Sequence, residues 1–362
     1  MKPRILLAGL VPIMAIASLL ASASDSVFPG KTWAKRSPRE VSLDPAALDA
    51  IRDFCQGRGC VVRHGFLVYE WGDAAKAGDV ASAVKPWFAH FLFRAVETGK
   101  LKDLDTRVAE FVPALRDINP DLEHKDRGIT FRHLATQTSC YGVSENPGKA
   151  FDYNDWQTAL FFDALFRKVY GATSETVDEQ VLHTGLTDAL QCEDNPTFLV
   201  FGEDRAGRLG ISPRDFARFG LLYLHEGNWN GTRLLSRKHA RMAVTSPLPA
   251  DLPRTRGTVA EMCPDARSIG SQKIPDNQTD HNGSYSYMWW MNGVDRDGNR
   301  NWPDAPTDVF AALGHANGMR GMAVFPSLDL IVSWNDTTLG DMPKDSNPLN
   351  TMMGLIAHAA KD

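Results

Sequence analysis

Ser82 and Lys85 form the pair with the clearest catalytic chemistry in this sequence, in the stretch Ser82-Ala83-Val84-Lys85. A serine hydroxyl is a poor nucleophile near neutral pH. A lysine three residues later lies on the same face of a helix, where it can accept the hydroxyl proton. This Ser-x-x-Lys spacing occurs once in the chain and is typical of serine enzymes that form acyl intermediates. A structural interpretation stays open, in which the serine caps a core helix and the lysine extends to water.

An acyl-transfer site also needs a second group that moves protons, and Tyr153 is the candidate. It lies in the aromatic stretch Phe151-Asp152-Tyr153-Asn154-Asp155-Trp156. A tyrosine held beside a lysine ammonium can pass protons between Ser82 and the leaving group. A tyrosine in an aromatic turn is often purely structural, so that alternative stays open.

The third requirement is an oxyanion hole, for which Gly314-His315-Ala316-Asn317-Gly318 is the candidate segment. We expect it to enter the strand that continues through Met322. A glycine-bearing edge strand lets a substrate carbonyl approach backbone N–H groups, and an N–H from residues 316–319 paired with that of Ser82 would hold the negative charge. An ordinary tight turn with a surface histidine is the alternative.

The elements around Ser82 are predicted to place it at the edge of a sheet. Val61 to Trp71 has the pattern of two strands turned at His64-Gly65, and an apolar helix from about Ala81 to Glu97 follows. A short amphipathic helix, Asp44 to Phe54, precedes these strands.

The remaining chain divides into a helical middle and a second group of strands. Leu104 to about Leu190 is mostly helical or loop-like, and a helix capped by Ser212 runs from Pro213 to His225. Later strands and a final helix are predicted at Tyr285 to Asn292, Met322 to Phe325, Leu328 to Trp334 and Asn350 to Ala360. This order indicates an α+β domain, with a sheet part at about 24–100 and 195–362 and a helical part at about 101–194.

The order and context of these segments resemble the serine beta-lactamase-like hydrolases, which include class C beta-lactamases, DD-peptidases and related esterases and amide hydrolases. The matching stretches are Val61 to Gly72, Asp79 to Lys85, Ile129 to Ser139, Phe151 to Asp155, Ser212 to Leu224 and Phe325 to Leu330. The resemblance implies a transpeptidase-like fold, in which an antiparallel sheet is flanked by helices and carries an inserted helical subdomain. It also implies Ser82 as the nucleophile, Lys85 as its activator and Tyr153 as the acid/base group.

Three departures from the family pattern bear on activity. Asp155 stands where the tyrosine motif usually ends in asparagine, and a carboxylate near Lys85 favours the charged ammonium, which is a poorer base. His315-Ala316-Asn317 stands where the family often has Lys-Thr-Gly or His-x-Gly, so the register of the oxyanion strand stays open by a residue or two. Pro86 falls in the second turn of the expected helix, where it removes a backbone donor and can bend the helix.

The third motif also bears on the substrate. Enzymes that bind a peptide or lactam carboxylate need a fixed cation there, whereas a histidine is mostly neutral at pH 7. Arg320 would supply the charge if its side chain points inward. The sequence therefore favours an uncharged ester or amide, with the long loop Pro247 to Gly283 as a wall of the site. A beta-lactam or peptidoglycan-like substrate is one alternative, and a non-catalytic relative that binds or senses through the same cleft is another.

The N-terminus predicts export. Lys2 and Arg4 precede an apolar run from Ile5 to Leu20, and Ala21-Ser22-Ala23 has the small residues of a cleavage site. Removal of a signal peptide at 1–23 would leave a periplasmic or secreted protein without a stable membrane anchor, since no cysteine follows the apolar run to accept a lipid.

The charge balance indicates the class of binding partner, and the cysteine content indicates possible disulfides. The formal net charge of -5 without a long basic run argues against nucleic acid as a partner and favours a small-molecule ester, amide or lactam. Five cysteines in an exported chain leave one over after pairing, and the candidate disulfides are Cys55 with Cys60 and Cys192 with Cys263, while the connectivity stays open. Cys140 is then the odd cysteine, for which we expect a buried thiol, with a reactive thiol as the alternative.

No metal or other cofactor is predicted. The four histidines weighed as ligands show no zinc spacing; they are His90, His133, His183 and His225. The segment Asp295 to Asn299 has its glycine in the wrong place for a calcium loop, so we expect a surface turn.

Overall fold

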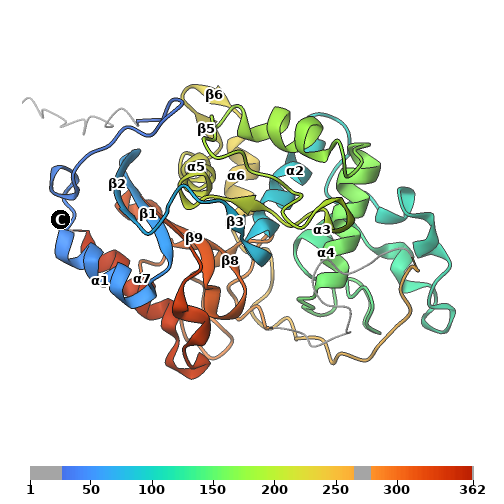
Figure 1. The fold of residues 1–362 in the computed structure, drawn as a ribbon. Coiled ribbons are helices and arrows are strands. Elements are labelled where there is room, and N and C mark those ends of the chain that lie inside the picture. The colour runs from blue at the N-terminus through green and yellow to red at the C-terminus, as the bar shows by residue number, and fades with distance from the viewer. Residues whose placement is uncertain (1–26, 265–278, 361–362) are drawn as a thin grey trace, which may run out of the picture.

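A six-stranded antiparallel sheet forms the centre of the fold, with the strand order β2-β1-β10-β9-β8-β7 (Figure 1). The computed structural model describes residues 27–264 and 279–360. The strands of the sheet are β1 (Arg58–Arg63), β2 (Phe66–Trp71), β7 (Trp290–Met291), β8 (Phe310–Gly314), β9 (Arg320–Phe325) and β10 (Leu330–Asn335). Strands from the two ends of the chain pair directly, because β1 is antiparallel to β10. The predicted α+β architecture is confirmed.

Two short ribbons complete the strands. The first pairs β3 (Gly78–Asp79) with β4 (Gly210–Ile211), just before the Ser82 turn. The second pairs β5 (Asn228–Trp229) with β6 (Thr232–Arg233). The first ribbon matters for the site because it ties the chain before Ser82 to a loop that is distant in sequence.

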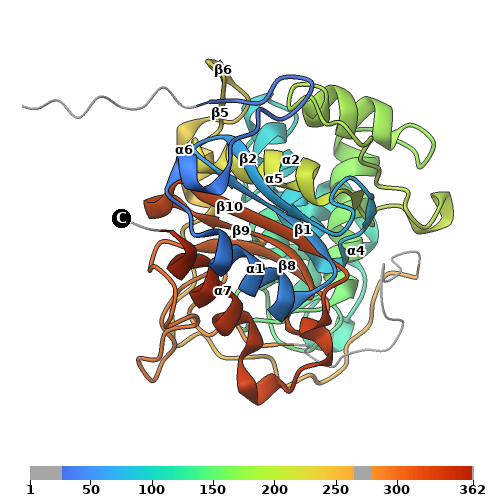
Figure 2. The same ribbon diagram turned by 60° about the vertical axis from the view of Figure 1, so that its left-hand side comes forward.

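Helices cover both faces of the sheet, as the turned view shows (Figure 2). One face carries the antiparallel layer of α1 (Pro45–Cys55) and α7 (Pro348–Ala359). The other face carries α5 (Pro213–Leu224) and, beyond it, α2 (Lys85–Glu97) and α6 (Arg237–Ala243). The sheet is therefore a buried middle layer.

Successive side chains of a strand point to opposite faces of the sheet, so neighbouring residues pack against different helix layers. Val61 and Val332 pack with α1 and α7. Their neighbours Val62 and Ile331 pack on the side of α2 and α5. On α5, Gly220 permits a close approach, since a Cβ there would lie 2.7 Å from the sulfur of Met322.

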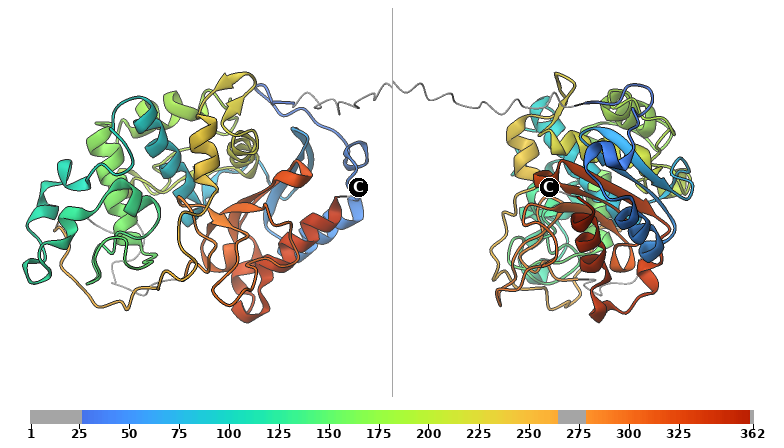
Figure 3. Two further views of the ribbon diagram at one scale, coloured as in Figure 1. Left: turned by 180° about the vertical axis from the view of Figure 1, so that it is seen from behind. Right: turned by 90° about the vertical axis from the view of Figure 1, so that its left-hand side faces the viewer.

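The helical part lies to one side of the sheet (Figure 3). It contains α3 (Phe131–Ala135), α4 (Asp155–Phe162) and two π-helical segments, Asp163–Val169 and Asp178–Thr187. In the described part of the chain, residues 101–194 add no strand to any sheet. No helix within 27–264 or 279–360 is both long and apolar enough to cross a membrane. The predicted signal peptide, residues 1–23, lies outside the described residues.

Local capping explains why several predicted helices were correct. Asp44 accepts a hydrogen bond from the N–H of Ala46 at 3.1 Å and opens α1. Ser212 accepts one from Asp215 N–H at 3.2 Å, with Pro213 at the first helical position of α5. Both helices start where the sequence predicted.

The predicted strand Tyr285 to Asn292 is mostly wrong, because only β7 joins the sheet. The N–H of Ser286 bonds to the carbonyl of Trp289, and Met288 has a φ of 66°, so the chain turns there. The preceding aromatic side chains are buried inside the domain instead of alternating along a ladder. Strand β8 was not predicted as a separate element.

The disulfide predictions are also wrong, because all five cysteines are free. Cys55 packs in the layer of α1 and α7, whereas Cys60 points to the opposite face of the sheet. Cys192 lies by Asp215, while the backbone N–H of Cys263 donates to the Tyr141 hydroxyl.

Cys140 is fully buried, as expected, and burial raises the pKa of its thiol to about 12. The thiolate is the reactive form of cysteine. A thiol with this pKa is therefore almost entirely unreactive at neutral pH.

Candidate active site

Ser82 and Lys85 lie at the junction of a turn and a helix. Ser82 is in a 3-10 turn, Ala81–Val84, and α2 begins at Lys85. Lys85 Nζ donates to Ser82 Oγ at 2.8 Å, and the lysine side chain is only 2% exposed. The lysine therefore does not extend to water, and the pair has the contact that proton transfer requires.

The backbone before Ser82 is held in a conformation that few residues adopt. Ala81 has a φ of 50°, in the left-handed region that disfavours side chains other than glycine. Its N–H donates to Asp79 Oδ1 at 3.0 Å, which helps to maintain this turn. Strained backbone of this kind is common at functional sites.

The predicted position of Pro86 in the second turn of its helix was wrong, because α2 begins later than expected. Because the helix begins at Lys85, Pro86 lies in the first turn and not in the second. An N–H in the first turn has no helical acceptor, so proline there breaks no hydrogen bond.

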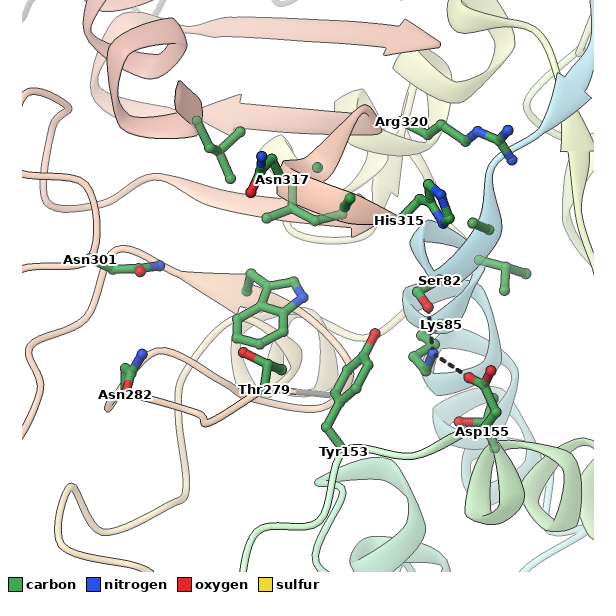
Figure 4. A pocket seen from close by; sticks show the side chains of 18 of the residues that line it. Ser82, Lys85, Tyr153, Asp155, Thr279, Asn282, Asn301, His315, Asn317 and Arg320 are labelled. Atoms are coloured by element: carbon green, nitrogen blue, oxygen red, sulfur yellow. Dashed lines mark hydrogen bonds and ion pairs between the residues drawn. The ribbon is translucent and has the colours of Figure 1, made fainter. Parts of the chain in front are cut away.

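Tyr153 and Asp155 complete the group around Lys85 (Figure 4). The Nζ of Lys85 lies 4.6 Å from the centre of the Tyr153 ring and 3.8 Å from Asp155 Oδ1. Asn154 caps α4, since its Oδ1 accepts from Gln157 N–H at 2.9 Å. The structure thus brings together the serine, lysine, tyrosine and aspartate that the sequence singled out.

Tyr153 is held by aromatic packing. Its ring centre lies 5.8 Å from that of Trp290 and 5.9 Å from that of Tyr285. Phe151 packs on Tyr285 at 5.2 Å from the other side. The tyrosine therefore has a fixed orientation, and Trp290, which the sequence did not single out, forms part of the site.

Asp152, immediately before Tyr153, is a second feature that sequence reasoning missed. Its carboxyl is fully buried, and Oδ2 accepts from Asn154 Nδ2 at 2.5 Å. Burial raises the pKa of Asp152 to about 7. Gln157 donates to the backbone carbonyl of Asp152, so both ends of the Tyr153 turn are tied to α4.

The predicted oxyanion segment begins at the last residue of β8 and continues as the turn that leads into β9, the strand that contains Met322, as expected. Strand β8 ends at Gly314, and a Cβ there would lie 2.1 Å from Val80 O and 3.1 Å from Ser82 N. The end of β8 therefore touches the Ser82 turn, and only glycine permits that approach.

Within the turn, the later N–H groups are already used. Gly318 N–H donates to His315 O, and Met319 N–H donates to Ala316 O, each at 3.1 Å. This corrects the expectation that any donor from 316–319 could serve. The N–H that directly follows the Gly314 contact is that of His315.

Arg320 lines the cavity, but its guanidinium is paired and is not the free cation that was considered. Its Nη1 donates to Asp79 Oδ2 at 2.6 Å, and the same carboxylate is paired with Arg208. Figure 4 shows the guanidinium beyond His315, on the side away from Asn301. Asp79 and Arg208 were not predicted as site residues, although Asp79 lies within one of the stretches that resemble the family.

These groups line a cavity of about 980 Å³. Ser82, Lys85, Tyr153 and Asp155 lie on its wall, and so does the segment from His315 to Gly318. The predicted loop wall contributes Asn282 to the lining. Residues 265–278 of that loop lie outside the described residues.

The segment Asp295 to Asn299, which was weighed as a calcium loop, is a turn closed by the Asp295 side chain. Asp295 Oδ1 accepts from the N–H groups of Asp297 and Asn299, at 2.9 and 2.8 Å. Across residues 27–264 and 279–360, no group of three or more histidine, cysteine, aspartate or glutamate side chains could hold a metal ion.

Comparisons with known proteins agree with this geometry. A sequence profile of the Beta-lactamase family matches residues 60–296. A proposed 6-aminohexanoate-dimer hydrolase from Bacillus anthracis has a similar structure, with 16% identity, a TM-score of 0.59, and 86% of this chain and 81% of that chain covered. No curated protein sequence matches the chain.

Two further solved structures share the fold. A beta-lactamase from Mycobacterium bovis is 17% identical, with a TM-score of 0.56 and coverage of 87% of this chain and 100% of that one. A beta-lactamase/D-alanine carboxypeptidase from Pseudomonas syringae is 14% identical, with a TM-score of 0.55 and coverage of 90% and 99%. The predicted sheet-and-helix architecture is therefore confirmed by profile and structure alike.

Proposed function

Because the chain belongs to the Beta-lactamase family of serine hydrolases, we propose that it cleaves an uncharged ester or amide through an acyl-enzyme on Ser82. The observation that carries this proposal is the 2.8 Å contact between Lys85 Nζ and Ser82 Oγ on the wall of an open cavity. Lysine in its neutral form accepts the serine proton as Oγ attacks the carbonyl carbon.

Tyr153 is the group that delivers a proton to the leaving atom. Its ring stacks beside Lys85 Nζ and faces the cavity that Ser82 lines. As the bond to the leaving oxygen or nitrogen breaks, the proton taken from Ser82 passes through Lys85 and Tyr153 to that atom. Water then attacks the acyl carbon, and the acid is released with Ser82 restored.

The oxyanion hole in this proposal consists of the N–H groups of Ser82 and His315. The contact of Gly314 with the Ser82 turn supports this choice, because His315 is the next residue along the chain. The competing N–H groups of Gly318 and Met319 already donate within the turn. Two preorganised N–H donors stabilise a tetrahedral intermediate much more than water does.

The preference for an uncharged substrate rests on how the charges at the cavity are paired. Lys85 lies beside Asp155, and Arg320 is turned toward Asp79. A beta-lactam or peptide carboxylate is the second candidate substrate. It is favoured by one feature: Arg208 and Arg320 share the single carboxylate of Asp79, which leaves one net positive charge.

A fluorophosphonate probe with intact-mass spectrometry tests the proposal. We expect one adduct on the wild-type protein and none on Ser82→Ala, whose rate on p-nitrophenyl esters should fall by about three orders of magnitude or more. Ser327→Ala, at an exposed position outside the cavity, is the control and should keep the adduct.

A folded wild-type protein that forms no adduct would favour the non-catalytic, binding role.

We also propose export, directed by residues 1–23. The intact mass of the protein tests it. Protein recovered from the periplasm or medium of a bacterial host should begin at Ser24. A full-length mass that retains Met1 would contradict processing.

A further inference from the structure

The cavity has two chemically different ends. One end, near Ser82, carries the charged lining residues. Lys85 and Asp155 pair beside Ser82, and Arg208 and Arg320 both pair with Asp79, which precedes Ser82 by three residues. The opposite end has only uncharged lining residues among those described, and we call it the neutral arm; it consists of Thr279, Asn282, Trp290, Asn301 and Asn317. Figure 4 shows Asn282, Asn301 and Thr279 across the cavity from Ser82.

Two amides in the neutral arm have a fixed orientation. Asn301 Nδ2 donates to Met291 O at 3.1 Å. Asn317 Nδ2 donates to the carbonyls of Leu339 and Met342, at 3.0 and 2.8 Å. Since the amide nitrogens face carbonyl oxygens, the side-chain oxygens are the ends left for a ligand. No described protein group donates to either oxygen, so both are available as acceptors.

The backbone segments that carry Asn282 and Asn301 are held together by close contacts. A Cβ on Gly293 would lie 2.0 Å from Gly283 O, so the segments around these two glycines are in direct contact. The N–H of Asn301 donates to Gly293 O at 3.0 Å. Asn282, directly before Gly283, and Asn301 are therefore held at a constant separation, as a binding site requires.

Acceptor oxygens select for hydroxyl donors and against carboxylates. A carboxylate would place its oxygens against those of Asn301 and Asn317, whereas a hydroxyl group can donate to each. Trp290, packed 4.8 Å from Tyr285, adds an apolar aromatic surface beside these oxygens. An aromatic face next to amide oxygens suits a neutral ring whose faces are apolar and whose edges carry hydroxyl groups.

The neutral arm lies on the side where the leaving group departs. In Figure 4, Tyr153 lies between Ser82 and the side of the neutral arm that carries Thr279 and Asn282. Trp290 packs directly on Tyr153, with ring centres 5.8 Å apart. Because the leaving oxygen receives its proton through Tyr153, the alcohol half of an ester extends toward the neutral arm.

We propose that the substrate is an ester whose alcohol half is a neutral, hydroxyl-rich group such as a sugar or polyol, held by the neutral arm. This inference rests on the proposed Ser82 hydrolase function. In the reaction, the ester C–O bond breaks, Ser82 Oγ takes the acyl group, and the proton from Ser82 passes to the sugar oxygen. Water then releases the acid.

Two matched acetates test the inference. One is a methyl glucoside with a single acetate on its primary hydroxyl, and the other is cyclohexylmethyl acetate, which has a similar ring without hydroxyls. We expect wild-type kcat/KM to be at least about tenfold higher for the sugar ester, as two or more added hydrogen bonds permit. Asn301→Ala and Asn282→Gly should each reduce that ratio about three- to tenfold. Asn146→Ala, at an exposed position outside the cavity, is the control and should leave the ratio unchanged.

The outcomes separate this inference from the proposed function. If p-nitrophenyl acetate is hydrolysed but the two matched acetates have equal kcat/KM, the neutral arm does not recognise hydroxyl groups and the inference is wrong. If neither that ester nor the fluorophosphonate probe reacts, the hydrolase function fails and this inference fails with it. If Asn301→Ala does not fold, Asn282→Gly alone tests the inference. This variant should fold, because the Asn282 side chain has no described hydrogen bond and its φ of 47° suits glycine.

Discussion

At the scale of single residues, the chemistry depends on what surrounds Lys85. The lysine is buried, touches Ser82, and has one carboxylate within 3.8 Å. Asp155 thus places a negative charge beside the group that takes the serine proton in the proposed mechanism.

Asp155→Asn should speed acylation near neutral pH. The substitution removes the negative charge that lies 3.8 Å from Lys85 Nζ and introduces the asparagine that the family usually has at this position, so we expect kcat/KM to rise. The measurement is kcat/KM on a p-nitrophenyl ester from pH 5 to 9. Asp53→Asn, an exposed position on α1, should leave the profile unchanged. A lower rate at every pH would show that the carboxylate is needed to position Lys85.

Asp152 predicts a pH dependence of stability. Burial raises its pKa from an ordinary 3.8 to about 7, so between these values the folded state holds a proton that the unfolded state has lost. Its contribution to stability is therefore complete below about pH 4 and decreases as pH rises to about 7. Asparagine at this position cannot ionise, so it removes the dependence.

Urea unfolding of wild type and Asp152→Asn at pH 4.5 and pH 8 measures this effect. Relative to the variant, wild type should lose up to about 3 kcal/mol of unfolding free energy at the higher pH. Asp117→Asn, an exposed carboxylate, should show no such difference. Equal pH dependence in wild type and Asp152→Asn would mean that Asp152 is ionised throughout.

At the scale of elements, the site depends on the contact between β8 and the Ser82 turn. This contact brings two segments more than 200 residues apart into backbone contact at Gly314. In the proposed mechanism, this contact places the N–H of His315 near that of Ser82 as the second oxyanion donor.

Gly314→Ala should damage both activity and stability. The added methyl would lie 2.1 Å from Val80 O, so the strand or the turn must move. We expect kcat/KM to fall about 100-fold and unfolding free energy to fall by about 1 to 3 kcal/mol. The control is Gly128→Ala, which has no heavy atom within 4 Å of the added methyl. Full activity in Gly314→Ala would place the oxyanion hole elsewhere.

At the scale of the whole molecule, the charged groups of the cavity come from distant parts of the chain. Asp79 and Arg208 meet through the β3–β4 ribbon, and Arg320 joins them from the sheet. Both arginines are paired with the one carboxylate of Asp79, so neither is a free cation, although the three groups together keep one net positive charge. Substrate preference is thus a property of the assembled fold.

Relative rates on an ester and a lactam test this preference. We expect kcat/KM for p-nitrophenyl acetate to exceed that for nitrocefin by at least about tenfold, because Arg208 and Arg320, the arginines that line the cavity, are both already paired with Asp79. Both rates should fall together in Ser82→Ala. Faster hydrolysis of nitrocefin would show that the net positive charge of Arg208 and Arg320 binds carboxylates after all.

The sequence alone determined the features that depend on local order. Ser82 and Lys85 are three residues apart, Ser212 and Asp44 cap their own helices, and Tyr153 lies beside Asp155, so each pattern is visible within a few residues. The α+β architecture followed from the order of such elements along the chain. Short-range spacing and capping constrain the backbone before distant segments meet.

Only the tertiary structure decided what depends on long-range contacts. The two predicted disulfides fail because the sheet separates Cys55 from Cys60 and because Cys192 lies by Asp215 whereas Cys263 contacts Tyr141. The oxyanion donor, the partner of Arg320 and the neutral arm were likewise not visible. Each depends on side chains or strand ends that are brought together by packing, and spacing in the sequence carries no record of that packing.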